Sequence, residues 1–160
     1  MPLENQTRQF DLPDAEATAA LGAWLADKLH LGDVLLLTGS IGAGKTHLAR
    51  SLIQTRLAAS GRYEDVPSPT FTLVQVYEDA EGEIWHADLY RLGHPQEVIE
   101  LGLDEAFRTA LCLIEWPDRL GSLTPMDALH LSITHSGEGR LATLTGPAKR
   151  IEALGQGPLA

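Results

Sequence analysis

The stretch GSIGAGKT, from Gly39 to Thr46, is the most informative part of this chain. It satisfies the phosphate-loop (Walker A) pattern GxxxxGK[ST], in which glycines let successive backbone N–H groups curl around phosphate oxygens. Lys45 would neutralise the β- and γ-phosphates of a nucleotide, and the Thr46 hydroxyl would ligate Mg²⁺. The positive end of the following helix would add to the field on the phosphates, together with the backbone of Ile41, Gly42, Ala43 and Gly44.

The residues on either side give this pattern the context that it requires. Val34 to Leu37 form a short apolar run, of the kind that is buried on both faces in a parallel sheet. Residues 45–59 return to helical spacing and end near Gly61. Because a strand precedes the glycines and a helix follows them, the pattern predicts a nucleotide site rather than a glycine-rich helix start that binds nothing.

Helical and strand patterns alternate along the rest of the chain. Helical spacing of apolar residues is found at 14–30, 95–102 and 104–109. Patterns typical of strands are found at 71–77, 83–90, 111–115, 128–134 and 140–144. The Gly- and Pro-rich end from about residue 155 is expected to fray. We therefore predict one α/β domain over residues 1–160, with a P-loop NTPase-like mixed β-sheet, flanking helices and antiparallel hairpins.

Composition restricts the possible classes of function. The 160 residues carry a net charge of −10, which opposes the approach of a nucleic-acid backbone to the bulk of the surface. The single cysteine, Cys112, lies in an apolar run and is expected to be buried and inert. No apolar stretch approaches the roughly 20 residues of a membrane helix, and the first residues do not resemble a secretory signal. We therefore expect a cytoplasmic protein that does not contact membranes.

Acidic residues at strand ends are the second chemical signal. A phosphate-loop site needs an acid at the end of another buried strand, to hold Mg²⁺ or to orient the attacking water. Glu115 ends the apolar run 111–114 and fits this role. His86 and Asp88 project to the same face of a strand, either as a metal pair or, as we favour, with His86 in a structural or supporting role. Trp116 could stack on a base or pack in the core.

The choice of nucleotide follows from a missing motif. The only asparagine of the chain is Asn5, so the guanine-reading NKxD pattern of regulatory GTPases is absent, and ATP is favoured over GTP. The sequence also has no Arg-rich stretch of the kind that forms the lid of small-metabolite kinases, which weakens a kinase interpretation.

Three further segments follow the phosphate loop in an informative order: SPTF at Ser68–Phe71, HADLYR at His86–Arg91, and IEW at Ile114–Trp116. In this order the chain resembles the TsaE family, formerly called YjeE, the ATPase of bacterial tRNA threonylcarbamoyladenosine synthesis. The resemblance extends from about Phe10 to Leu144. SPTF and HxDxYR together are much more specific than the phosphate loop alone.

The resemblance implies ATP and Mg²⁺ as cofactors. Thr46 and Glu115 would serve Mg²⁺, and Lys45, Glu115 and Asp88 would support hydrolysis. Thr70, in SPTF, would act as a switch. Two further residues would lie close to the nucleotide, namely Trp116 and Arg140, the latter from a late GxGR-like segment.

The function implied by the resemblance is that of an ATP-binding and ATP-hydrolysing subunit. It would be required for the N6-threonylcarbamoyladenosine at position 37 of tRNA, would act with the TsaD and TsaB proteins, and would meet tRNA only through them. Its hydrolysis would be slow alone and activated by these partners. Two alternatives stay open: a small-molecule P-loop kinase, and a nucleotide-sensing binding module without useful turnover.

Overall fold

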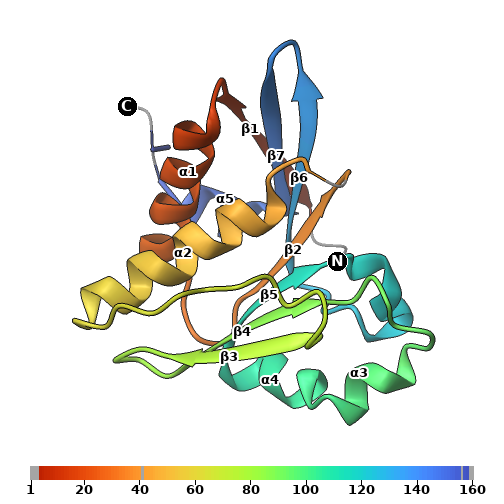
Figure 1. The fold of residues 1–160 in the computed structure, drawn as a ribbon. Helices are drawn as coiled ribbons and strands as arrows, with labels where there is room; N and C mark the ends of the chain where they lie inside the picture. The colour runs from red at the N-terminus through yellow and green to blue at the C-terminus, as the bar shows by residue number, and fades with distance from the viewer. Residues whose placement is uncertain (1–3, 41, 156, 159–160) are drawn as a thin grey trace.

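The computed structural model describes residues 4–40, 42–155 and 157–158. The elements in these ranges are, in chain order, β1 (Asn5–Leu12), α1 (Ala15–Lys28), β2 (Val34–Gly39), α2 (Lys45–Ala59), β3 (Val74–Glu78), β4 (Glu83–Asp88), α3 (Gln96–Glu100), α4 (Leu103–Thr109), β5 (Leu111–Glu115), the 3-10 helix η1 (Pro117–Leu123), β6 (Leu129–Ser136), β7 (Gly139–Pro147) and α5 (Ala148–Ala153). Figure 1 shows their arrangement, with α1 and α2 side by side. Within these ranges, no helix combines the length and the apolar character needed to cross a membrane.

The described strands form one seven-stranded mixed sheet in the order β1-β7-β6-β2-β5-β4-β3. Its centre is parallel, because β2 pairs with both β5 and β6 in that sense and β4 pairs with β5. Antiparallel pairing extends the sheet on both sides, through β3 with β4 and through β7 with β6 and β1. This arrangement confirms the predicted P-loop NTPase-like α/β fold with antiparallel hairpins.

Helices cover both faces of the sheet, so its central strands are buried on both sides. Leu35 and Leu37 of β2 join a core with residues of α1 and α2, whereas Val34 and Leu36 join a second core with residues of α3 and α4. Successive side chains of a strand point to opposite faces, so a strand in this position must be apolar throughout. The run 34–37 was therefore interpreted correctly as a doubly covered strand.

The helix α1 shows how the predicted 14–30 segment is bounded. Asp14 is its N-cap residue, and the Asp14 Oδ1 atom accepts a hydrogen bond of 2.8 Å from the Ala17 N–H. Such a cap satisfies one of the N–H groups that a helix start leaves unpaired. The helix ends at Lys28, whose charge suits the negative end of the helix dipole.

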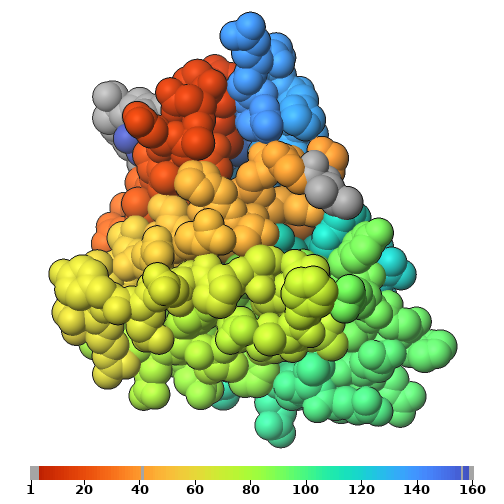
Figure 2. Space-filling view, viewed as in Figure 1, coloured from red at the N-terminus to blue at the C-terminus, as the bar shows by residue number. Residues whose placement is uncertain are grey.

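Three elements were not predicted from the sequence: β1, η1 and α5. Among the described strands, β1 lies at the edge of the sheet and pairs only with β7, and Leu12 is its one fully buried residue. An edge strand with mostly exposed side chains carries little of the apolar alternation by which strands are recognised. Figure 2 shows the β6–β7 hairpin (blue) standing out beside α1 (red).

The predicted strand 71–77 was wrong in its first three residues. Strand β3 begins at Val74, because the Leu73 N–H donates to the Pro69 carbonyl over 2.8 Å and closes a turn. Leu73 has φ +68°, a left-handed conformation that breaks a strand. The neighbouring strand β4 also ends earlier than predicted, at Asp88 instead of residue 90.

The last turn of α2 is tied to two other elements by the buried guanidinium of Arg56. Its Nε donates to Asp79 Oδ2 over 2.8 Å, and its Nη2 donates to Glu81 Oε2 over 3.0 Å. Its Nη1 donates to the carbonyls of Ala26 and Leu29 over 3.0 and 2.8 Å. These bonds join α1, α2 and the turn of the β3–β4 hairpin, and they hold the far end of α2 in place.

Candidate functional site

The phosphate loop connects the end of β2 to the start of α2. Gly44, the N-cap residue of α2, has φ +111° and no side chain to pair with the first helical N–H groups. A Cβ atom on Gly39 would lie 2.5 Å from the Ile133 carbonyl oxygen, so only glycine fits there. The start of α2 is therefore open to an anion, unlike the start of α1, which Asp14 caps. The predicted site residue Ile41 lies outside the described residues.

Lys45 folds back over the loop from the first turn of α2. Its Nζ donates to the Gly39 carbonyl over 2.8 Å and lies 4.0 Å from the centre of the Trp116 ring. Burial lowers the pKa of Lys45 from its ordinary value, and the negative charges of Glu115, Asp88 and Asp118 oppose this shift. A bound phosphate group would add a further negative charge beside the Lys45 ammonium group.

Thr46 and Glu115 join the phosphate loop to the end of β5. The Thr46 hydroxyl donates to Glu115 Oε1 over 2.9 Å, and the Glu115 side chain is almost completely buried. Its other oxygen, Oε2, lies 2.7 Å from Nε2 of the buried His86. The structure thus places the predicted strand-end acid in contact with the phosphate loop.

Asp88 stands beside Glu115 because the two residues are paired in the register of β4 and β5. Its Oδ1 accepts a hydrogen bond of 3.0 Å from the Tyr90 N–H, and its Oδ2 accepts one of 3.4 Å from the Thr70 hydroxyl. Thr70 also shares a hydrogen bond of 2.7 Å with the Ser68 hydroxyl. Segment SPTF is thus connected to the site through its hydroxyl groups.

A cavity of about 250 Å³ brings most of the predicted residues together. Its lining consists of Gly42, Lys45, Thr46, Thr70, Asp88, Tyr90, Glu115 and Trp116. Tyr90 was not singled out from the sequence, although it belongs to the HADLYR segment that drew attention to its neighbours. The Tyr90 ring packs on the Trp116 ring, with ring centroids 4.9 Å apart. Because the Trp116 ring also contacts Lys45, it lies at the Lys45 end of the site.

Arg140 lies outside this cavity and lines a neighbouring one of about 290 Å³. The two cavities share Gly42, and the second also contains Gly44, His47 and Asp14. The Nη1 of Arg140 donates to the Gly139 carbonyl over 3.1 Å, while its buried Nε has no hydrogen-bond partner among the described residues. Arg140 therefore lies next to the phosphate loop, but in a different cavity from the carboxylates of Asp88 and Glu115.

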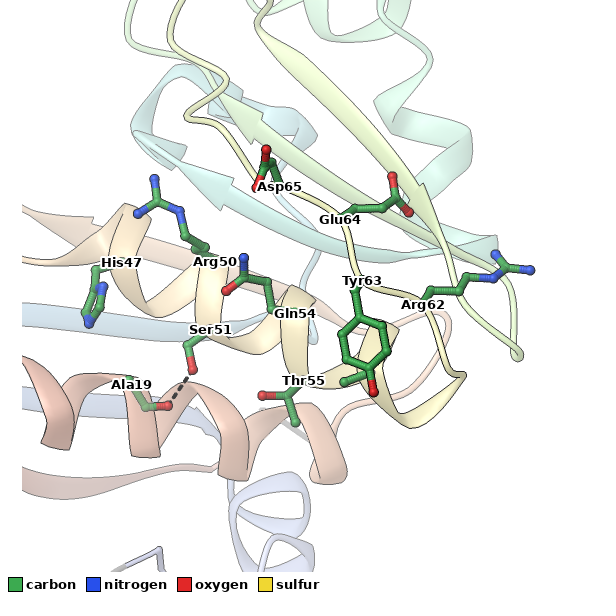
Figure 3. A pocket seen from close by; sticks show the side chains of 11 residues that line it. Ala19, His47, Arg50, Ser51, Gln54, Thr55, Arg62, Tyr63, Glu64 and Asp65 are labelled. Atoms are coloured by element: carbon green, nitrogen blue, oxygen red, sulfur yellow. Dashed lines mark hydrogen bonds between the residues drawn. The ribbon is translucent and has the colours of Figure 1, made fainter.

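A larger cavity of about 650 Å³ lies elsewhere, between α1, α2 and the loop 62–65 (Figure 3). Figure 3 shows Arg50, Gln54 and Tyr63 along this groove, and Ser51 bonded to the Ala19 carbonyl. Of the predicted nucleotide-site residues that the structure describes, none lines this cavity. Choosing the site by cavity volume alone would therefore miss the residues that have the chemistry of a phosphate site.

The residues present suit Mg²⁺ better than a metal held by protein alone. In the part of the chain that the structure describes, no group of three or more His, Cys, Asp and Glu residues could hold a metal ion. Mg²⁺ at phosphate sites commonly uses one or two protein oxygens, with the remaining ligands coming from phosphate and water. The Thr46 hydroxyl directs its proton to Glu115, which leaves its oxygen lone pairs available to a cation.

The family model of "Threonylcarbamoyl adenosine biosynthesis protein TsaE" matches residues 12–142. The chain belongs to the TsaE family. The matched residues include all of the predicted site residues, and the resemblance inferred from the sequence motifs is confirmed.

Relatives and a solved structure agree with membership of the TsaE family. The "tRNA threonylcarbamoyladenosine biosynthesis protein TsaE" of Rickettsia felis is 35% identical over 152 residues, which cover 92% of this chain and 87% of the relative. The protein of the same name from Haemophilus influenzae is 35% identical, covering 81% of this chain and 83% of the relative. The crystal structure of YdiB from Bacillus subtilis has a TM-score of 0.72 and 28% identity, covering 96% of this chain and 93% of that one.

Proposed function

We propose that the chain binds ATP with Mg²⁺ and hydrolyses it during synthesis of N6-threonylcarbamoyladenosine at position 37 of tRNA. The contact of 2.9 Å between Thr46 and Glu115 carries this proposal, because it joins a phosphate loop to a buried acid at the end of a neighbouring strand. Membership of the TsaE family supports the pathway. TsaD and TsaB are the proposed partners, and the proposed location is the cytoplasm.

The two cavities beside the phosphate loop suggest how the nucleotide lies. The phosphates would occupy the cavity at Lys45, against the N–H groups of Gly42, Ala43 and Gly44. The nucleoside would pass over the loop toward the second cavity, where the buried Nε of Arg140 has no hydrogen-bond partner within the described part of the chain. In this placement Trp116 contacts Lys45 and the phosphates rather than stacking on the base.

Hydrolysis would form a bond between a water oxygen and the γ-phosphorus, and break the bond to the oxygen that bridges the β- and γ-phosphates. Asp88 is the acid that would orient this water and accept its proton, since the hydrogen bond from Thr70 keeps its Oδ2 at the cavity. Lys45 would stabilise the charge that develops on the phosphate oxygens. When bound, Mg²⁺ would neutralise further phosphate charge beside Thr46 and Glu115.

The proposed partners account for how an acidic protein would act in tRNA modification. A net charge of −10 opposes direct binding of a nucleic-acid backbone. A division of labour in which TsaD and TsaB hold the tRNA, while this chain turns over ATP, removes that difficulty. Slow turnover of the isolated chain is part of this proposal.

The test is ATP hydrolysis by the purified chain with Mg²⁺, alone and with TsaD and TsaB. We expect hydrolysis to rise when the partners are added and to be abolished in Thr46→Ala. Thr55→Ala, also on α2 but outside the nucleotide cavity, is the matched control and should behave as the wild type.

Other outcomes would favour the alternatives. Bound nucleotide without any increase in hydrolysis, combined with repeated tRNA modification, would favour a nucleotide-sensing module. An added metabolite that becomes phosphorylated as fast as ADP forms would favour a kinase. Normal tRNA modification by a Thr46→Ala, Glu115→Ala double variant would contradict the proposal altogether.

A further inference from the structure

The pair formed by His86 and Glu115 is a buried contact beside the proposed Mg²⁺ site. His86 lies in the interior of the sheet on β4, with Gln75 of β3 and Leu113 of β5 as its register neighbours. Its side chain is fully buried, and its Nε2 lies 2.7 Å from Glu115 Oε2. Core packing alone would not require a histidine side chain to contact the Glu115 carboxylate, so this contact indicates a further role for His86.

The direction of this hydrogen bond follows from the chemistry of its two partners. A carboxylate oxygen can only accept, so Nε2 of His86 must carry the hydrogen and donate it to Glu115. Nδ1 of His86 is buried and has no partner among the described residues. A buried donor without a partner is costly, so a ring with its hydrogen on Nε2 alone fits this environment best.

Both oxygens of Glu115 are therefore engaged, Oε1 by the Thr46 hydroxyl and Oε2 by His86. Two hydrogen bonds from different elements fix the plane of the carboxylate. Lys45 is close enough for its charge to interact with Glu115, yet no ion pair joins these two described side chains. The orientation of Glu115 is thus set by its hydrogen bonds with His86 and Thr46 rather than by an ion pair with Lys45.

We propose that His86 is a positioning residue, which holds the Glu115 carboxylate against Thr46 so that this pair can bind the divalent cation of a metal–nucleotide complex. This rests on the proposed role of Thr46 and Glu115 in binding Mg²⁺. His86 does not touch the nucleotide or the cation and acts only through Glu115. Partners of this kind commonly contribute 10- to 100-fold to metal affinity.

Two amide substitutions separate hydrogen bonding from packing. The side-chain amide of His86→Gln has a reach similar to that of Nε2 and can donate to Glu115. The amide of His86→Asn is one methylene shorter and corresponds to Nδ1, so it cannot reach the same oxygen. The two variants differ by a single methylene group, which makes each the control for the other.

The measurement is binding of ADP by the full chain, first in EDTA and then with increasing Mn²⁺, followed by calorimetry and by the electron paramagnetic resonance of Mn²⁺. For His86→Asn we expect Mn²⁺ affinity to fall about tenfold or more, with metal-free ADP affinity within about twofold of the wild type. His86→Gln should keep most of the Mn²⁺ affinity. In a Glu115→Gln background, His86→Asn should have no further effect on Mn²⁺ binding.

Three results would overturn the proposal: an unchanged Mn²⁺ affinity in His86→Asn, an equal fall in metal-free ADP affinity, or a His86→Gln variant as impaired as His86→Asn. A wild type without any metal-enhanced nucleotide binding would instead contradict the proposed function itself. If His86→Asn does not fold, ¹⁵N-histidine spectra of the wild type keep the proposal testable. The buried ring, with its slowly exchanging N–H, must then carry hydrogen on Nε2, and hydrogen on Nδ1 would overturn the assignment.

Discussion

The two ends of α2 each carry a buried cation, and the two cations have opposite surroundings. Arg56, in the last turn, donates four hydrogen bonds to the carboxylates of Asp79 and Glu81 and to two backbone carbonyls. Lys45, in the first turn, donates one hydrogen bond to a carbonyl and faces a cavity of about 250 Å³. Their exposed fractions are nearly equal, 7% and 6%. Burial therefore does not distinguish Arg56 from Lys45, whereas the number of hydrogen bonds that each side chain donates does.

The helix dipole sharpens this contrast. A cation near the C-terminal end of a helix is stabilised by the dipole, and one near the N-terminal end is destabilised. Arg56 thus has a favourable position, two carboxylate partners and two carbonyl partners, so its role is to hold the structure together. Lys45 has an unfavourable position and, among the described residues, donates one hydrogen bond, so a bound phosphate would accept from its remaining N–H groups. The lowered pKa of Lys45, caused by burial, agrees with this interpretation.

The largest effect is expected at the structural end of the helix. Arg56→Met should lower the free energy of unfolding by about 3–5 kcal/mol, because it leaves buried Asp79 without its cation and removes the guanidinium donors from Asp79 Oδ2 and two backbone carbonyls. Urea unfolding followed by circular dichroism would measure this. Arg62→Met, which changes an exposed arginine in the following loop, is the control and should change stability by less than about 0.5 kcal/mol. Equal stabilities of the two variants would contradict the structural role assigned to Arg56.

At the other end of α2, a substitution should reduce nucleotide affinity strongly and stability only slightly. Lys45→Met should lower nucleotide affinity by about 10- to 100-fold, the equivalent of about 1.5–3 kcal/mol for hydrogen bonds to a charged group. Its stability should stay within about 1 kcal/mol of the wild type, since the protein itself provides few partners for this charge. Calorimetric titration with ADP and urea unfolding would test both parts. Lys149→Met, at an exposed lysine, is the matched control; a large loss of stability in Lys45→Met would contradict the distinction.

A smaller effect should separate the two acids that pair with Arg56. Asp79→Asn should destabilise the fold by about 1–3 kcal/mol, because the carboxylate is buried and also accepts from the N–H groups of Glu81 and Gly82. Glu81→Gln should cost about 0.5 kcal/mol or less, since the Glu81 side chain is 55% exposed. Both changes are isosteric, so comparing the urea midpoints of the two variants measures the loss of each negative charge without a change in side-chain size. The opposite order would show that burial of the acid does not determine its contribution.

The smallest effect concerns a buried group that stays neutral. Burial raises the pKa of Cys112 to about 12, so its thiol keeps its proton in the folded chain at pH 8. A thiol reagent should therefore label the unfolded chain quickly at pH 8 and the folded chain only as fast as it opens. Between pH 9, the ordinary pKa, and about 12, the unfolded thiol loses its proton first, so the stability contribution present below pH 9 is lost as pH rises. Rapid labelling of the folded chain at pH 8 would contradict the assigned burial.

Elements whose patterns are local were predicted best from the sequence. The predicted helix 45–59 and strand 111–115 have the same bounds as α2 and β5. Strand β1 was not predicted, because its stability comes from pairing with β7 and not from an apolar pattern of its own. Residues 71–73 were wrongly included in a strand, because β-forming residue types do not reveal a turn that Pro69 closes.

The phosphate loop, the helix that follows it and the buried strand that ends in Glu115 could all be predicted from local sequence, because each depends on neighbouring residue types and their spacing. Which side chains meet at the site depends on the folded arrangement of the sheet. Thr46 and Glu115 are 69 positions apart, and His86 and Glu115 are 29 apart, so their contacts depend on strand order and register. The same holds for Arg56 and for Arg140, whose surroundings come from distant elements. Strand order is set by packing of the whole sheet, for which no short stretch of sequence carries the information.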